Sequence, residues 1–136
     1  MVATVERFQL EKRVDGIIVY RLADLLRESI DAFTEAATKT DLWAVENDCH
    51  ARCLLDITKV RFPNPYAISR IQTLIKSTPD EIRESFAVLT PTSNLYSFAR
   101  AIINHIPQSK TNSIRFFREE AEALAWLDER LQEIGP

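Results

Sequence analysis

Short apolar segments alternate with amphipathic segments along most of this chain, and that alternation limits the folds open to it more than any single motif does. Residues 53–57 and 86–89 are short apolar runs, typical of strands that are buried on both faces of a sheet. Each is followed by a stretch whose apolar residues recur every three or four positions, which is the period of a helix with one buried face. Strands that alternate with helices predict a parallel sheet reached by right-handed crossovers.

The remaining segments extend this pattern. Residues 5–10 and 16–22 are predicted as strands, and Asp15-Gly16 between them favours a type I′ hairpin turn, in which both positions have positive φ. The predicted fold class is therefore α/β, with a mixed, mostly parallel sheet opened by a β-hairpin and about four helices packed on it. A last strand is predicted at residues 114–117, and the main helices are predicted at residues 24–38, 64–75, 93–106 and 119–134.

Two segments are less regular. Thr78, Pro79 and Glu81 match a capping box, because threonine and glutamate lie three positions apart around a proline suited to a first helical turn. They predict a short additional helix. Residues 40–52 show no clean period and mix Trp43 with charged residues, so we interpret them as a connection without an assigned structure.

Length and charge bound the function classes. The 136 residues match the size of one domain with one hydrophobic core, so we expect a single domain over residues 1–136. The 17 basic and 20 acidic residues are interspersed and give a net charge of −3, which argues against a nucleic-acid partner. No stretch has the character of a signal peptide or a membrane span. Two cysteines are too few for a disulfide framework, so we expect a cytoplasmic protein.

The residues that most often carry chemistry do not form a catalytic or metal-binding pattern. Cys49, His50 and Cys53 are the right types for zinc but lack a nearby fourth ligand, and His105 is interpreted as a structural residue near a helix end. The two glycines lie in a hairpin and at the C-terminus, so they cannot build a phosphate-binding loop. We therefore expect no enzyme activity, no metal and no cofactor.

One loop has the composition of a small-anion site. Thr92, Ser93 and Asn94 lie between a predicted strand and a predicted helix, where hydroxyl groups and free backbone N–H groups meet the positive end of the helix. The simpler interpretation, which we favour, is that these residues cap the helix.

Two segments resemble the STAS domain family. Leu54-Leu55-Asp56-Ile57-Thr58-Lys59-Val60-Arg61-Phe62 is similar to the family's central strand and to the valine-x-phenylalanine that leads to its switch loop. Phe117, Glu119-Glu120-Ala121 and Ala125-Trp126-Leu127 are similar to its closing strand end, acidic turn and last helix. With the order of elements, they resemble the SpoIIAA-like, STAS/SEC14-related branch, to which bacterial anti-sigma factor antagonists belong.

The family's switch loop has a changed counterpart here. In the switch proteins this loop carries a D-S-S-G pattern, and a partner kinase phosphorylates the second serine to control binding. The matching stretch is Asn64-Pro65-Tyr66-Ala67, so Tyr66 stands where that serine would be. The resemblance therefore implies an interaction module without the serine switch. From the residues alone, Asn64 and Pro65 are a helix cap and a first helical residue, while Tyr66 can also be a contact residue.

These observations predict a non-catalytic regulatory or protein-interaction module that resembles anti-sigma factor antagonists. The sequence does not identify the protein partner, and self-association as a homodimer stays open. The alternative, from the SEC14-related side of the resemblance, is a carrier of a small lipid-like ligand, which needs an enclosed apolar cavity under the helices. The predicted partner-binding residues are Thr58, Arg61, Asn64, Pro65 and Tyr66.

Overall fold

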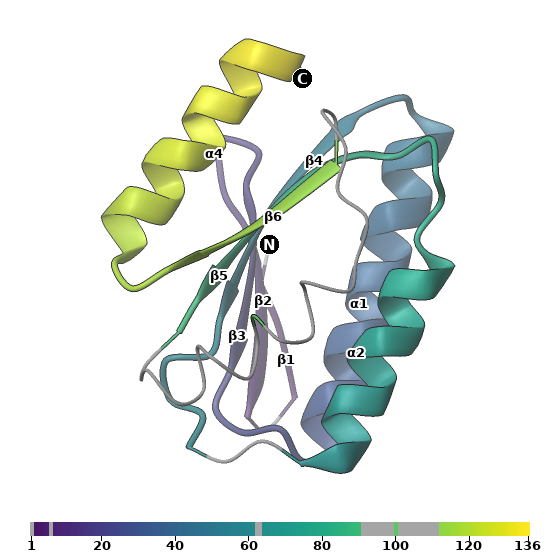
Figure 1. Ribbon diagram of the computed structural model, residues 1–136, viewed down its shortest axis with the longest axis vertical. Helices are drawn as coiled ribbons and strands as arrows, with labels where there is room; N and C mark the ends of the chain where they lie inside the picture. The colour runs from purple at the N-terminus through teal and green to yellow at the C-terminus, as the bar shows by residue number, and fades with distance from the viewer. Residues whose placement is uncertain (1, 6, 62–63, 91–99, 101–111) are drawn as a thin grey trace.

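The computed structural model describes residues 2–5, 7–61, 64–90, 100 and 112–136. In this part of the chain, six strands form one sheet in which they lie side by side in chain order. The first three strands pair antiparallel, and the pairs from the third strand to the sixth are parallel (Figure 1). The strands are β1 (Val2–Val5), β2 (Phe8–Lys12), β3 (Ile18–Leu22), β4 (His50–Asp56), β5 (Arg83–Leu89) and β6 (Asn112–Phe117).

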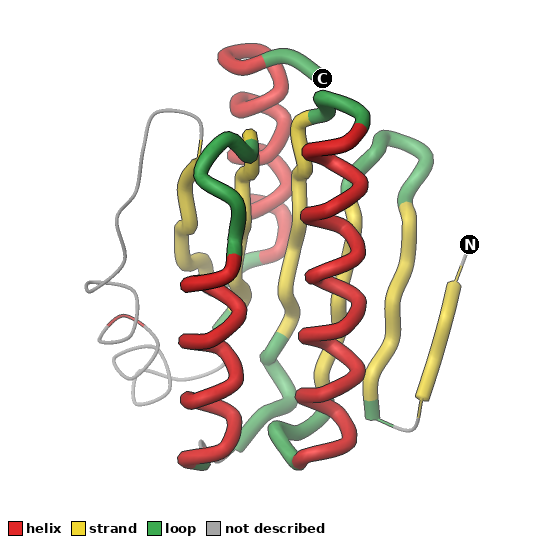
Figure 2. The backbone as a smooth tube through the Cα atoms, turned by 90° about the vertical axis from the view of Figure 1, so that its right-hand side faces the viewer, coloured by secondary structure: helices red, strands yellow, loops and turns green. Residues whose placement is uncertain are grey.

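Helices cover both faces of the sheet. Helices α1 (Arg27–Glu46) and α2 (Pro65–Ser77) lie next to each other on one face, and α4 (Glu120–Ile134) lies on the other (Figures 1 and 2). The described residues therefore contain three helices, compared with the four predicted as the main helices, and the helix predicted at residues 93–106 lies outside them except for residue 100. None of the described helices is long and apolar enough to cross a membrane.

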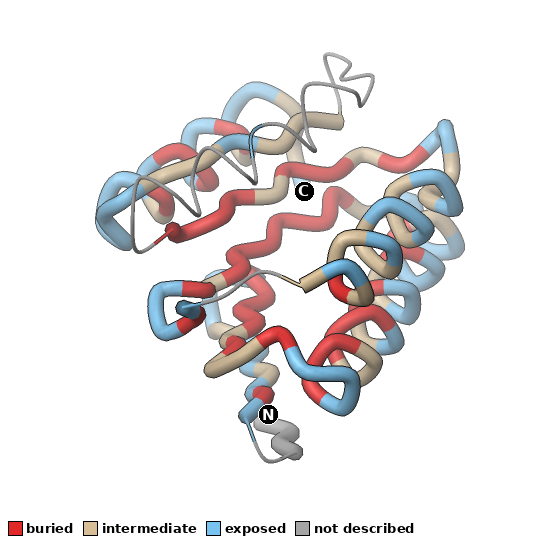
Figure 3. The backbone as a smooth tube through the Cα atoms, turned by 60° about the horizontal axis from the view of Figure 1, so that its bottom comes forward, coloured by how far each residue is buried: buried red, intermediate tan, exposed pale blue. Residues whose placement is uncertain are grey.

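The central strand was predicted correctly. Strand β4 lies between β3 and β5 and pairs in parallel with both, and its first six residues are buried. Leu54 faces α4, while Cys53 and Leu55 face α1 and α2, as the alternation of a strand requires. Figure 3 shows the strands as the buried centre of the molecule and exposed residues on the outer sides of the helices.

The opening hairpin exists, but its turn differs from the predicted type. Gly16 has a φ of 89°, whereas Asp15 does not have positive φ. The Gly16 N–H donates to the Arg13 carbonyl at 3.1 Å, and the Arg13 N–H donates to the Ile17 carbonyl at 2.9 Å. This pattern is that of a type I turn followed by a glycine bulge, which needs positive φ at the glycine alone.

The first predicted strand, residues 5–10, is two strands. Val5 is the last residue of β1, and Phe8 is the first residue of β2, with which β1 pairs antiparallel. Arg7 between them has a φ of 77°. The chain therefore reverses inside a segment that has neither glycine nor proline to mark a turn.

The two irregular segments differ from their interpretation. Most of the expected connection at residues 40–52 is regular, because residues 40–46 continue α1 and residues 50–52 begin β4. The helical period of residues 40–46 is obscured because Leu42 and Trp43 are exposed. The predicted extra helix at residues 78–81 is absent, because Thr78 ends α2 instead of starting a helix. Its N–H donates to the Ile75 carbonyl at 3.2 Å, and its hydroxyl lies 3.0 Å from the Leu74 carbonyl.

Candidate functional site

The predicted partner-binding residues lie at the end of the sheet where β3 and β4 finish and where α1 and α2 begin. Thr58 follows β4, and its backbone N–H and its hydroxyl both donate to one Asp56 carboxylate oxygen, at 2.9 and 2.6 Å. Arg21 on β3 donates to the other oxygen at 2.6 Å and to Glu120 at 3.0 Å. These contacts hold the start of the loop after β4 against the strand ends.

The electrostatics of Asp56 follow from these contacts. Partial burial alone would raise the pKa of Asp56, but the two hydrogen bonds from Thr58 and the charge of Arg21 outweigh it and lower the pKa. The carboxylate is therefore ionised at neutral pH, and both of its oxygens are engaged. Asp56 thus positions the loop.

Asn64 joins the beginnings of the two helices. Its side-chain oxygen accepts from the Ala67 N–H at 2.8 Å, so it caps α2 as predicted, and its side-chain amide donates to the Leu25 carbonyl at 2.7 Å. Pro65 is the first residue of α2 and is exposed. Asn64 therefore fixes α2 relative to the segment before α1, and its polar atoms serve the fold.

Tyr66 is half-buried and engaged by α1. Its hydroxyl donates to Asp31, and the Arg27 guanidinium lies 4.0 Å above its ring centroid. The hydrogen bond to Asp31 raises the pKa of Tyr66. Arg70 on α2 lies 3.3 Å from the same Asp31 carboxylate and donates to Thr34 at 2.8 Å. The tyrosine thus holds the first turns of the two helices together.

Around this internally bonded framework, an exposed group of mainly basic residues remains. Its three cations come from α1 and from the loop after β4, and no ion pair engages Lys59 or Arg61 within the described residues. Helices α1 and α2 both begin here. Asp24 and Glu28 offset the positive end of α1, whereas the first turn of α2 has no acidic residue, so the positive end of α2 adds to the local positive potential. We call this group the basic surface; it consists of Arg27, Thr58, Lys59, Arg61 and Pro65.

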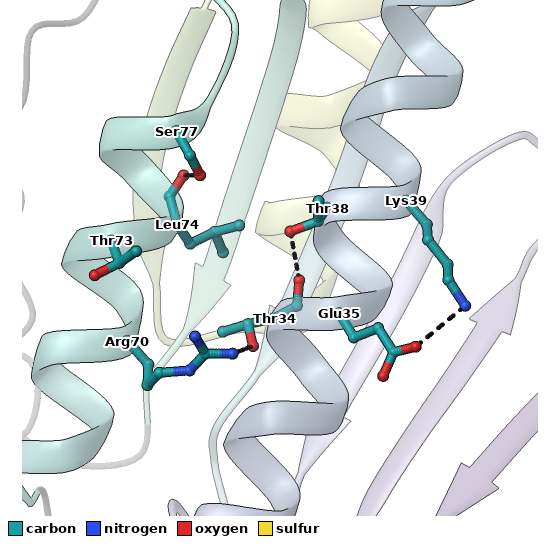
Figure 4. A pocket seen from close by; sticks show the side chains of 8 residues that line it. All are labelled: Thr34, Glu35, Thr38, Lys39, Arg70, Thr73, Leu74 and Ser77. Carbon is teal, nitrogen blue, oxygen red and sulfur yellow. Dashed lines mark hydrogen bonds and ion pairs between the residues drawn. The ribbon is translucent and has the colours of Figure 1, made fainter.

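The open groove between α1 and α2 has a volume of about 370 Å³. Figure 4 shows its two walls, with Arg70 reaching across from α2 to Thr34 on α1. The hydroxyls of Thr38, Thr73 and Ser77 donate to carbonyls of their own helices, so they offer oxygen atoms that accept hydrogen bonds. Except for Leu74 the lining residues are polar; they are Thr34, Glu35, Thr38, Lys39, Arg70, Thr73 and Ser77.

The Cys49, His50 and Cys53 group does not form a metal site. The side chains of His50 and Cys53 lie on opposite faces of the sheet. His50 contacts Ser85 on the face that α4 covers, whereas Cys53 packs among the core residues under α1 and α2. In the described part of the chain, no three histidine, cysteine or carboxylate side chains are grouped to hold a metal ion. The predicted anion site of Thr92, Ser93 and Asn94, and His105, lie outside the described residues.

The sequence interpretation missed a buried polar network under α4. The Arg130 Nε donates to the Ser85 Oγ at 2.8 Å, and this Oγ lies 2.8 Å from the His50 Nε2. The His50 Nδ1 lies 2.8 Å from the Gly135 carbonyl, which can only accept, so Nδ1 carries the proton and Nε2 accepts from Ser85. One signal in the sequence was available: Arg130 falls on the apolar stripe that includes Ala123.

A serine bonded to a histidine is also the arrangement of a catalytic nucleophile and its base. Ser85, however, has 0% of its surface exposed and already receives a hydrogen bond from Arg130. Burial, together with the nearby positive charges of Arg130, Arg52 and Arg83, lowers the pKa of His50. The network therefore anchors the end of α4 to the sheet, and no substrate can reach the hydroxyl in this conformation.

Comparison with known proteins found no relative: no protein-family model, no curated protein and no solved structure matches the chain.

Proposed function

We propose that this protein is a non-catalytic interaction module of STAS-like type that binds a protein partner through the basic surface. The observation that carries the proposal is the contrast between two sets of residues at the same end of the sheet. Asn64, Tyr66 and Asp56 have their polar atoms bonded inside the protein, whereas Lys59 and Arg61 are exposed beside them. The internal bonds hold the surface in place, while the charges of Lys59 and Arg61 remain exposed to a partner.

The chemistry of the surface favours an acidic segment of the partner. Three cationic side chains and the N-terminus of α2 attract carboxylates, and Pro65 adds an apolar contact at the first turn of α2. Because the tethers through Asn64 and Tyr66 already order the two helix starts, binding does not need to order them again. Pre-organisation of this kind reduces the entropy cost of association.

A phosphoserine switch does not belong to the proposed mechanism. Pro65 has no hydroxyl, the Tyr66 hydroxyl donates to Asp31, and the Thr58 hydroxyl donates to Asp56. Phosphate on Tyr66 or Thr58 would bring negative charge against a carboxylate that now accepts a hydrogen bond. Control of binding by the charge of the partner's acidic segment fits this surface better.

The second function considered, a carrier of a lipid-like ligand, is not favoured by any observation in the described residues. The α1/α2 groove is open to solvent, whereas an apolar ligand needs an enclosed apolar cavity. A cytoplasmic location is part of our proposal, since both cysteines are free, as expected in a reducing compartment.

Affinity capture from the source cell with a matched pair of variants tests the proposal. Lys59→Glu with Arg61→Glu reverses two charges on the basic surface. Lys12→Glu with Lys76→Glu reverses two exposed charges at the opposite end of the sheet and changes the net charge equally. We expect a protein that is captured by the wild type and by the second variant but is lost with the first. Equal capture by all three forms would contradict the proposal.

A further inference from the structure

Two carboxyl groups face each other inside the protein, between α1 and the sheet. Asp41 lies on the buried side of α1 and Glu84 is the second residue of β5, and each residue has 7% of its surface exposed. Their side chains are hydrogen-bonded to each other. Neither residue belongs to the basic surface or to the network under α4.

In the part of the chain that the structure describes, no cation acts on the pair. Tyr20 on β3 and Cys53 on β4 are the nearby titratable groups, and both are buried. The Thr78 hydroxyl, after α2, lies within hydrogen-bonding range of both the Leu74 carbonyl and the Asp41 carboxyl, so it can donate to one of them at a time. Among the described residues, neither Asp41 nor Glu84 forms an ion pair.

The described residues next to Glu84 on the strands bring no positive charge to the pair. Arg83 extends toward Asp48 and the Ile134 carbonyl, and Ser85 points to His50 and Arg130 on the α4 face of the sheet. On β6, the residue in register with Glu84 is Asn112, which is neutral. Nothing in these contacts stabilises two negative charges.

Elementary chemistry then determines the protonation of the pair. A hydrogen bond between two carboxyl groups needs a proton on one of them. Burial raises the pKa of both groups, while the hydrogen bonds from Glu84 and Thr78 act in the opposite direction on Asp41. For Glu84, burial, the hydrogen bond with Asp41 and the charge of Asp41 all raise the pKa. The pair therefore holds one proton between its two carboxyl groups, and the pKa of Glu84 is raised well above its ordinary value.

We propose that Asp41 and Glu84 form a proton-sharing latch, which holds the C-terminal part of α1 on the sheet while one proton is present and releases it when that proton leaves. Two carboxylates at hydrogen-bonding distance in a buried site repel each other, and the available relief is the movement of α1 away from β5. The released segment includes Leu42 and Trp43, whose exposed fractions of 52% and 47% show that they already face solvent.

The raised pKa of Glu84 determines how the stability of the protein depends on pH. Because the folded protein holds the Glu84 proton more tightly than the unfolded chain, its stability falls as pH rises from the ordinary glutamate pKa of 4.5 until the folded pKa is passed. Glu84→Gln keeps a hydrogen-bond donor toward Asp41 and cannot ionise, so it should remove this dependence. Glu81→Gln, three positions away and exposed, is the matched control.

The first test is direct and uses the wild-type protein. Infrared difference spectra at pH 7 should contain the C=O stretching band of a protonated carboxyl group, which should remain in Glu81→Gln and be lost in Glu84→Gln. The band should also disappear on alkaline titration, in step with faster amide exchange of residues 40–46. A wild-type spectrum without the band at pH 7 would overturn the proposal.

The second test measures the movement. Trp43 and Trp126 are the only tryptophans, so Trp126→Phe makes the fluorescence report on α1 alone. We expect a reversible alkaline change in Trp43 emission that is unchanged by Glu81→Gln and lost in Glu84→Gln. If Glu84→Gln shows the same pH profile as its parent, or if amide exchange at residues 40–46 does not follow the infrared band, the latch does not exist.

Discussion

Replacing Ser85 with alanine should destabilise the protein strongly, because this one hydroxyl connects Arg130 and His50 beneath α4. Ser85 has no exposed surface, and its oxygen makes two hydrogen bonds of 2.8 Å. Its removal leaves the Arg130 Nε and the His50 Nε2 buried without their partner. Each buried polar group left unpaired costs about 1–3 kcal/mol, so we expect a loss of roughly 2–6 kcal/mol in the free energy of unfolding.

Urea unfolding followed by tryptophan fluorescence measures this loss, since Trp126 lies 5.7 Å from the Arg130 guanidinium and reports on the same region. Ser69→Ala, on the exposed side of α2, is the control and should change the stability by less than about 0.5 kcal/mol. The reasoning would be refuted if the two alanine variants unfolded at the same urea concentration with the same slope.

Three further outcomes are expected. The folded pKa of His50 lies below its ordinary value of 6.5, so its contribution to stability is present above pH 6.5 and is lost as pH falls through the folded pKa. In His50→Gln, the free energy of unfolding measured with urea should therefore fall less steeply as the pH is lowered. Leu127, which is fully buried, should cost about 2–5 kcal/mol on replacement by alanine, measured by thermal or urea unfolding. Phosphopeptide mass spectrometry of protein from its own cells should find no stoichiometric phosphate between Thr58 and Ser69, and such a phosphate with an effect on partner binding would contradict the proposed contact mechanism.

Signals confined to a few neighbouring residues predicted structure well. Asn64 and Pro65 were recognised as the start of a helix because a cap and a first-turn proline act locally, and the cap hydrogen bond to Ala67 is present. The apolar run of β4 predicted the central strand for the same reason. Prediction failed where the same residue types are found at both ends of helices. Thr78 and Pro79 follow the end of α2, although their residue types are also typical of a helix start.

Features that depend on residues distant in sequence could not be predicted. Tyr66 was predicted as a contact residue, but Asp31, which fixes its hydroxyl, lies 35 positions earlier. The pairing of His50 with Ser85 depends on the register between β4 and β5, and the pairing of Asp41 with Glu84 depends on how α1 lies on the sheet. No period or local motif specifies these contacts, because the tertiary packing creates them.

The contact of the basic surface with a partner is tested most directly by amide hydrogen exchange of the protein, alone and bound to the partner captured from the source cell. Binding through this surface should slow exchange at residues 57–61 and 66–70 and leave the C-terminal turns of α4 unchanged, since these turns lie at the other end of the sheet, on its opposite face. Protection confined to α4, or to the C-terminal turns of α1, would contradict the proposed contact.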